Sequence, residues 1–452
     1  MVDVNILQVS FLDSLGGAAR IAWTLHQGYK AQGINSSMAV EVKLSQDPAV
    51  YKIPASVPSD VPERLLYLLG QLATQYKLKI GKKGIGEFLQ RLSRSRHWWT
   101  RYWGREDFDF SSTSKLFDLS GSRPDIVHLH NLHNNYFNLR FLPTLSKTIP
   151  TLITLHDMWL LSGHCAYPFD CMRWKTGCGA CPYLGTPPAI NKDATAYNWQ
   201  RKKNIYADSK LYLAFPSKWI MQKIAESILA PAVVDSRIIH NGVDLSVFFP
   251  IEKRLAREKL KLSPDALVIL FVAVGSSANV FKDFTTIHKA LEVVSNQWIG
   301  KRIIFVALGG KESISGIGNI EIIVVPYIND LQEVARYYQA ADLYIHASRA
   351  DTFPTVVLEA LACGTPVIAT GVGGTSEQIK EGETGFITPP ADPFAMANSV
   401  LYLLKEDELR NRLSIGAALD AKKRFGHERM IGEYLTYYKE ITRDWQSRIG
   451  NK

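Results

Sequence analysis

The chain has 452 residues, enough for two or three domains, with the 46% hydrophobic and 21% charged content of an ordinary globular protein. No apolar run approaches the roughly 18 residues of a membrane-spanning helix. The N-terminal residues include an early acid and no basic lead, which argues against a signal peptide, so we expect a cytoplasmic protein.

The first half of the chain predicts alternating strands and helices, a pattern typical of a parallel sheet with crossover helices. A strand is expected at residues 4–11, followed by a tight turn at Gly16 and Gly17 and a helix at 18–32. Later strands of this half are expected at residues 125–129, 151–155, 211–215 and 236–239.

An insertion at residues 60–105 carries most of the net charge. Between residues 63 and 105 there are ten Lys or Arg and two Glu, a net +8 of the total +9. Apolar and aromatic residues are interleaved with them, namely Leu65, Leu66, Leu68, Leu69, Trp98, Trp99, Tyr102 and Trp103. This mixture suits an interfacial helix on an anionic membrane. A helical pair with a solvated basic face is the alternative, and a nucleic-acid patch is a third interpretation that lacks a recognised binding fold.

A loop at residues 163–185 holds four of the five cysteines, at Cys165, Cys171, Cys178 and Cys181. The last pair has the C-x₂-C spacing of a metal knuckle. Disulfides are disfavoured in a reducing compartment, and a long loop without an evident helix or strand needs something to order it. We therefore expect a structural zinc ion that clamps the loop, with unligated thiols or a redox-labile loop as the alternative.

The second half repeats the alternation. Strands are expected at residues 266–274, 302–308, 320–325, 342–346 and 366–370, with helices between them, for example at 331–341, and a terminal helix at 427–448. The sequence thus predicts an α/β domain at 1–245, a second at 246–426 and a C-terminal helical segment at 427–452. A ligand in such sheets lies at the carboxyl ends of the strands.

The most informative stretch is residues 346–374, HASRADTFPTVVLEALACGTPVIATGVGG. Asp351 and Glu359 stand eight residues apart, where a loop enters a short apolar helix. Two acids so placed can address the two ends of one extended ligand. The simpler alternative is that Asp351 caps the helix and Glu359 lies on a solvated face.

This stretch resembles the donor site of retaining glycosyltransferases with the GT-B fold, in family 4 (glycosyl transferases group 1). The matching positions are Ser348, Asp351, residues 352–354, Glu359, Ala360, Gly364, Pro366 and Val367, with Asp351 standing where the family has Glu. The resemblance implies two Rossmann-like domains that face each other across a cleft, and a C-terminal helix that crosses back to the first domain.

The resemblance also implies roles for the acids and their surroundings. Glu359 would hold the ribose hydroxyls of the nucleotide, and Asp351 would contact hydroxyls of the donor sugar. Backbone groups around Phe353 and Pro354 would border that sugar. The resemblance implies no catalytic metal, because GT-B enzymes usually need no divalent ion.

Lys282 fits the family lysine that stabilises the departing diphosphate, a point charge for an anionic leaving group. The alternative for Lys282 is a solvated surface lysine that opens a helix. Ser276 occupies the position where the family commonly has Arg, so one cation is missing. Arg349, close to Asp351 in sequence, is the candidate that supplies this charge.

Residues of the first half complete the predicted site. Gly16 and Gly17 resemble the family loop near the donor phosphates, where glycines expose helix N–H groups to an anion, although such pairs are often simple turns. His156, at a strand end, resembles the family's cleft histidine near the transferred sugar. His128 and His130 share one strand face; we expect them and His133 to contact the acceptor, with metal binding as the alternative.

The function implied is transfer of a sugar from a UDP- or GDP-linked donor to a hydroxyl acceptor, with retention at the anomeric carbon. The segments HLHNLHNNYFNL and TLHDMWLLSGHC and the cysteine loop resemble the exopolysaccharide branch related to colanic-acid synthesis. That branch implies a saccharide or lipid-linked acceptor, no nucleic acid partner, and a protein peripheral at the cytoplasmic membrane face. The alternatives are a catalytically silent sugar-nucleotide-binding protein and a basic, zinc-containing nucleic-acid-binding protein.

Overall fold

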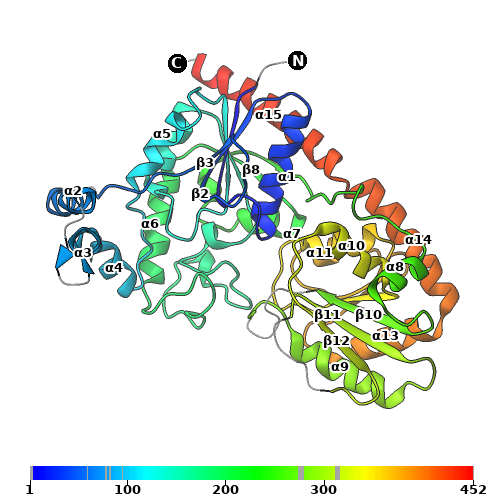
Figure 1. The fold of residues 1–452 in the computed structure, drawn as a ribbon. Helices are drawn as coiled ribbons and strands as arrows, with labels where there is room; N and C mark the ends of the chain where they lie inside the picture. Colours follow the sequence, from blue (N-terminus) through cyan, green and yellow to red (C-terminus); the bar gives the residue numbers. More distant parts are fainter. Residues whose placement is uncertain are drawn as a thin grey trace. The chain divides into compact units, whose positions relative to one another are not determined.

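Figure 1 shows a computed structural model of the chain, which describes residues 4–58, 60–76, 79–80, 83–93, 95–272, 279–310 and 316–450. The chain forms two compact units. Unit 1 consists of Met1–Phe215, Met221–Ile238 and Leu435–Lys452, and unit 2 of Pro216–Ile220 and Ile239–Tyr434. Both units are α/β structures with a wholly parallel main sheet, which confirms the predicted fold class.

The sheet of unit 1 has seven strands in the order β3-β2-β1-β6-β7-β8-β9. Its inner strands are apolar runs buried on both faces, as expected of a parallel sheet covered by helices; all five residues of β8 are buried. The strands are β1 (Ile6–Leu12), β2 (Ser36–Val42), β3 (Val50–Lys52), β6 (Ile126–His130), β7 (Thr151–Thr154), β8 (Leu211–Phe215) and β9 (Val233–Ile238).

The principal helices against this sheet are α1 (Gly17–Ala31), α5 (Leu142–Thr148) and α6 (Thr195–Ala207). The basic insertion forms a separate group at the edge of unit 1, visible in Figure 1 as helices away from the sheet. It comprises α2 (Val61–Gln75), a short antiparallel pair β4 (Lys79–Ile80) and β5 (Lys83–Gly84), α3 (Ile85–Leu92) and α4 (Ser95–Tyr102).

The sheet of unit 2 has six strands in the order β12-β11-β10-β13-β14-β15. Strand β10 shows how it is covered: Val268 and Leu270 belong to the core on one face, and Ile269 to the core on the other. The strands are β10 (Leu267–Val272), β11 (Ile303–Leu308), β12 (Glu321–Val325), β13 (Leu343–His346), β14 (Val367–Thr370) and β15 (Gly385–Thr388).

Several helices of unit 2 begin at a side-chain cap. Asp283, Asp330 and Asp392 each accept a hydrogen bond from a backbone N–H of the first turn. The helices are α8 (Lys253–Leu260), α9 (Phe284–Gln297), α10 (Leu331–Ala340), α11 (Thr355–Ala362), α12 (Thr375–Gln378), α13 (Pro393–Lys405) and α14 (Asp407–Arg424). The short helix α7 (Lys218–Ile224) follows β8 and contributes residues to both units.

The C-terminal helix α15 (His427–Gly450) begins in unit 2 and belongs to unit 1 from Leu435 onward. Tyr437 and Tyr438 are buried in unit 1, and the Tyr437 hydroxyl donates to the Leu213 carbonyl of β8 at 3.3 Å. The predicted return of the terminal helix to the first domain is confirmed. In the part of the chain that the structure describes, no helix is both long and apolar enough to span a bilayer.

Candidate functional site

Unit 2 brings Lys282 and Asp351 together beside the carboxyl end of β13. The Lys282 ammonium lies 2.9 Å from Asp351 Oδ2 and donates to Ser348 Oγ at 3.3 Å. The side chains are only 13% and 22% exposed, so the pair is largely shielded from solvent. The alternative of a solvated surface lysine at position 282 is therefore wrong.

His346, the last residue of β13, lies beside this pair. Its Nε2 is hydrogen-bonded to Ser348 Oγ at 2.9 Å and lies 3.7 Å from Asp351 Oδ2. Its Nδ1 is hydrogen-bonded to Tyr344 Oη. Burial and the nearby Lys282 charge lower the pKa of His346 to about 4, so the imidazole is neutral. Burial opposes ionisation of Asp351, but Lys282 and His346 outweigh it and hold the pKa of that carboxyl well below its usual range.

The position of the missing cation and the residue expected to replace it have different outcomes. Arg349 carries its guanidinium on the surface, 58% exposed, with Nη2 3.8 Å from Asp283 Oδ1. Its charge is thus directed at the cap of α9 in this structure, although its backbone N–H holds the strand end by donating to the Phe281 carbonyl. Ser276 lies outside the described residues.

The simpler interpretation of the acid pair is wrong on both counts. Helix α11 begins after Pro354 without any side-chain cap, so Asp351 does not cap it. Glu359 lies within the helix as expected but is 4% exposed, and its Oε2 accepts a hydrogen bond from the Tyr338 hydroxyl at 3.0 Å. A buried carboxylate on an otherwise apolar helix needs such partners; its contact with a ribose stays a prediction.

The loop between the two acids is packed into unit 2. The Phe353 ring is buried and stacks on His240 with ring centroids 5.0 Å apart, and its carbonyl accepts from Asn241. The Pro354 carbonyl accepts from the Gln378 side chain at 2.9 Å. These bonds fix the backbone that the sequence predicts to border the donor sugar.

Unit 1 places four histidines at the ends of β6 and β7. His130 Nδ1 and His156 Nε2 are 3.0 Å apart, and His130 Nε2 is bonded to Gln8. His128 is bonded to Tyr438 and Thr154, and its ring centroid lies 4.0 Å from that of His130, so the shared strand face is confirmed. Both are fully buried with both ring nitrogens engaged, and the expectation that they contact an acceptor is therefore wrong.

Burial keeps these imidazoles neutral. It lowers the pKa of His156 to about 4 and lowers the pKa values of His128 and His130 well below the usual range. His133 behaves differently, because Asp157 Oδ2 lies 3.0 Å from its Nε2. Burial alone would lower the pKa of His133, but the Asp157 carboxylate outweighs burial and raises it.

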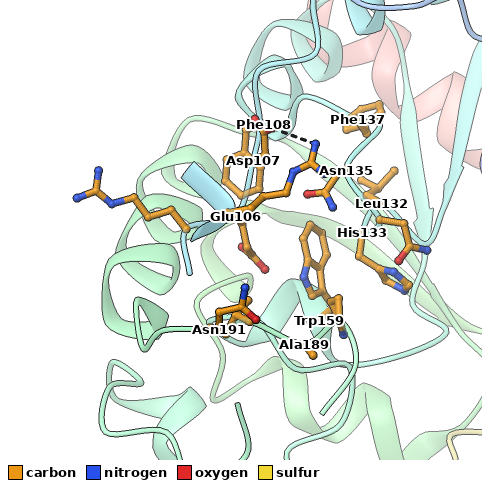
Figure 2. A pocket seen from close by; sticks show the side chains of 15 residues that line it. Glu106, Asp107, Phe108, Leu132, His133, Asn135, Phe137, Trp159, Ala189 and Asn191 are labelled. Carbon is orange, nitrogen blue, oxygen red and sulfur yellow. Dashed lines mark ion pairs between the residues drawn. The ribbon is translucent and has the colours of Figure 1, made fainter. Parts of the chain in front are cut away.

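His133 also lines a pocket of about 240 Å³ in unit 1. In Figure 2, His133 and Trp159 lie together on one wall, and their ring centroids are 5.9 Å apart. Arg101 and Asp107 form an ion pair at another wall, at 3.8 Å. The pocket is lined as well by residues 105–108, 132–135, 137 and 188–191. Charged, amide and aromatic groups in one concave site are typical of a polar ligand such as a sugar.

Gly16 lies between β1 and α1, and Gly17 is the first residue of α1. Gly16 is the N-terminal cap of α1 with φ of 92°, a conformation that favours glycine, and no side chain caps the helix. A Cβ at either position would meet nothing within 4 Å. The loop is therefore open at both glycines, and its contact with an anion stays a prediction.

The cysteine loop is ordered by more than its thiols. Trp174 is buried within it, its carbonyl accepts from Trp199, and Arg173 donates to the carbonyls of Gly179 and Ala180. The four cysteines and His164 border one cavity of about 20 Å³. Across the described ranges, however, no three or more His, Cys, Asp or Glu side chains are arranged to hold a metal ion.

Sequence reasoning missed the supporting residues of both clusters. His346 opens the stretch 346–374 and Tyr338 lies in an amphipathic helix, but only the fold shows that they contact the two acids. Asp157 was visible beside His156, but its pairing with His133 depends on how the loops after β6 and β7 meet.

Comparisons with known proteins agree with this architecture. Residues 252–419 match the family described as Glycosyl transferases group 1. D-inositol 3-phosphate glycosyltransferase 2 of Catenulispora acidiphila is 33% identical over 179 residues, 37% of this chain and 42% of that protein. The chain covers about half the length of this and other D-inositol 3-phosphate glycosyltransferases that it matches. The putative colanic acid biosynthesis glycosyl transferase WcaC of Escherichia coli is 24% identical over 70% of this chain and 77% of its own length.

Solved structures resemble the whole chain. A sucrose-phosphate synthase from Thermosynechococcus elongatus has a TM-score of 0.60 at 17% identity, covering 98% of this chain and 100% of its own. Anabaena Alr3699/HepE, solved in complex with UDP, has a TM-score of 0.60 at 15% identity, covering 97% and 100%. The architecture is that of the GT-B fold, and residues 252–419 match the glycosyl transferases group 1 family.

Proposed function

We propose that the protein is a glycosyltransferase that moves a sugar from a nucleoside-diphosphate donor to a hydroxyl acceptor, with retention at the anomeric carbon. The observation that carries the proposal is the Lys282–Asp351 pair, 2.9 Å apart at the strand ends of the unit that matches the family. A cation and an anion so placed can address a phosphate and a nearby sugar hydroxyl of one ligand.

Each residue has a physical role in this proposal. Lys282 supplies the positive charge that stabilises the departing diphosphate. Asp351, ionised at neutral pH, accepts hydrogen bonds from sugar hydroxyls, and Glu359 holds the ribose. None of these groups is a covalent nucleophile, so catalysis rests on positioning and on stabilisation of the leaving group's charge.

The donor is proposed to be UDP- or GDP-linked. In support, HepE has been solved with UDP and with UDP-glucose, although its likeness to this chain is one of fold. For the acceptor, we propose a saccharide or lipid-linked saccharide in exopolysaccharide or glycolipid assembly, and a cytoplasmic location at the membrane face. The name of the WcaC relative points the same way.

A panel of UDP- and GDP-sugars, assayed for donor hydrolysis and for transfer, tests the proposal. At least one donor should be turned over, and NMR of the product should show the donor's anomeric configuration. Tight donor binding without turnover on any donor would support the silent binding protein instead, and an inverted product would contradict retention. No catalytic divalent ion is proposed, so EDTA should leave the turnover unchanged.

We further propose that the cysteine loop holds a structural zinc ion. Support comes from the donor chemistry: four thiols and His164 border one small cavity, and the backbone N–H groups of Gly163 and Tyr183 donate to Cys178 Sγ and Cys181 Sγ. The sulfurs would have to turn toward the cavity to complete a ligand shell. Metal analysis of protein purified without added zinc tests this, and less than about half an equivalent per chain would contradict it.

A further inference from the structure

Helix α2 turns its large apolar residues toward solvent. Six of them follow one side of the helix and its end and are 45–78% exposed: Val61, Leu65, Leu68, Leu69, Leu72 and Tyr76. In a globular protein, such a stripe normally faces the core. Here the buried positions of the helix are Tyr67, Gly70 and Ala73.

The packing of α2 on α3 explains this inversion. A Cβ on Gly70 would lie 2.9 Å from Gln90 Cγ, and one on Gly86 would lie 2.0 Å from Thr74 Oγ1. The two helices therefore cross closely through their small residues. The leucines remain outside because the protein's own contacts use the opposite face.

Helices α3 and α4 add further exposed apolar side chains. Phe88 and Leu92 of α3 are 64% and 44% exposed. Trp98 stacks on Tyr102 with ring centroids 5.3 Å apart, and the Lys192 ammonium lies 3.7 Å from the Trp103 ring centroid. We call the exposed residues of the three helices the α2–α4 surface: the six of α2, Phe88, Leu92, Trp98, Trp99, Tyr102 and Trp103.

The sequence around this surface is strongly basic, with a net charge of +8 between residues 63 and 105. Leucines beside tryptophan, tyrosine and basic residues match the region of a bilayer where acyl chains meet headgroups. The cores of protein interfaces are depleted in charged residues, particularly lysine. We propose that the α2–α4 surface binds the surface of an anionic lipid bilayer, with its apolar side chains at the acyl boundary and its basic residues at the headgroups.

Membrane binding would bring the unit 1 pocket to the lipid surface, because α4 belongs to the α2–α4 surface and also lines the pocket. Its Arg101 lines that pocket, and Arg101 and His97 also line a neighbouring cavity of about 480 Å³. A headgroup-linked saccharide could then enter the pocket without leaving the bilayer. This consequence rests on the proposed function, whereas membrane binding itself does not.

Vesicle sedimentation tests the proposal with the full chain. We expect binding to vesicles of phosphatidylcholine with phosphatidylglycerol, and weaker binding at 1 M salt, where the Debye length is about 3 Å. The triple variant Leu65→Gln/Leu69→Gln/Leu72→Gln should lower vesicle affinity by about tenfold or more. The matched control is Ile415→Gln/Leu419→Gln on α14, whose two residues are each 64% exposed, and its affinity should be unchanged.

Three results would overturn the proposal: no sedimentation of the wild-type chain with anionic vesicles, equal affinity of wild type and triple variant, or an equal loss in the control. Self-association of the wild type that the triple variant abolishes, without vesicle binding, would assign the surface to a second copy of the chain. Because no sugar donor is present, failure here leaves the proposed transferase activity standing. Conversely, vesicle binding without turnover of any donor would remove only the proposed activity.

Discussion

The strand ends of the two units hold opposite kinds of chemistry. Unit 2 places a charged pair there, Lys282 with Asp351, over a neutral histidine. Unit 1 places a row of buried histidines there, and burial lowers the pKa values of His128, His130 and His156. The Lys282 ammonium can bind an anion, whereas the neutral imidazoles of unit 1 carry no charge and already hydrogen-bond within the unit.

The difference extends to what surrounds each sheet. The family match at residues 252–419 lies entirely within unit 2. Unit 1 carries the basic helices α2–α4 and the cysteine loop. Unit 2, which is proposed to bind the donor, therefore keeps the family pattern. Unit 1, which is proposed to face the acceptor, carries the inserted helices and the cysteine loop.

The largest effect is expected from Lys282→Ala, which removes the positive charge of the Lys282–Asp351 pair. Turnover should fall by about 100-fold or more, the loss typical of one transition-state donor. Lys289→Ala, an exposed lysine on α9, is the matched control and should turn over at the wild-type rate. Near-native turnover of a folded Lys282→Ala protein, judged by circular dichroism, would refute the assigned role.

The two units should share one response to pH. The folded chain holds His156 and His346 neutral, with pKa values of about 4, whereas an unfolded histidine binds a proton near pH 6.5. The unfolded state therefore binds more protons below pH 6.5, and the free energy of unfolding falls as the pH is lowered toward 4. For the fully buried His346 alone the loss is on the order of 3 kcal/mol.

Denaturant unfolding at a series of pH values measures this dependence. His346→Gln and His156→Gln should each reduce its slope by about one proton between pH 4 and 6.5. An unchanged slope in a folded variant would show that the histidine is protonated in the native state.

Substitutions at Glu359 and Tyr338 can distinguish a role of Glu359 in stability from a role in binding the donor. Glu359→Ala leaves the Tyr338 hydroxyl without this acceptor and should cost about 1–3 kcal/mol of unfolding free energy. Tyr338→Phe breaks the same bond and should cost about 1 kcal/mol. If Glu359 also holds the ribose, the KM for the donor rises in Glu359→Gln but not in Tyr338→Phe. If Glu359→Gln and Tyr338→Phe have the same KM for the donor, Glu359 has only a structural role.

The smallest effect concerns the loop of unit 1. Gly16→Ala forces a side chain into φ of 92° and should cost about 1 kcal/mol of unfolding free energy. Gly17→Ala is the control, because its φ is not positive and a Cβ there meets nothing within 4 Å. Thermal unfolding of the two variants should therefore differ, and equal midpoints would contradict the strain at Gly16.

Much of the fold could be predicted from the sequence because long apolar strands alternate with amphipathic helices. The strand expected at residues 302–308 is β11, and the helix expected at 427–448 is α15. Strand β2, SSMAVEV, was missed because serines and a glutamate interrupt its apolar pattern. The edge strand β15 is only four residues long and was missed as well.

The site was predicted as well as local spacing allows. The order of Asp351, a loop and Glu359 in a short helix is confirmed. The burial of Glu359 depends on Tyr338, and the ion pair of Lys282 joins residues 69 positions apart. Such contacts follow from strand order rather than from neighbouring residues. Likewise, only the packing of Gly70 and Gly86 shows which side of α2 is exposed.

Helix α15 has a consequence for how the protein can be divided. Unit 1 is not a continuous piece of chain, since Leu435–Lys452 supplies Tyr437 and Tyr438 to its interior. A fragment that ends at residue 238 would lack the partner of His128 and would open its core to water. The two halves are therefore not separable modules: an isolated first domain requires the last eighteen residues to be supplied, joined by a linker or added as a peptide.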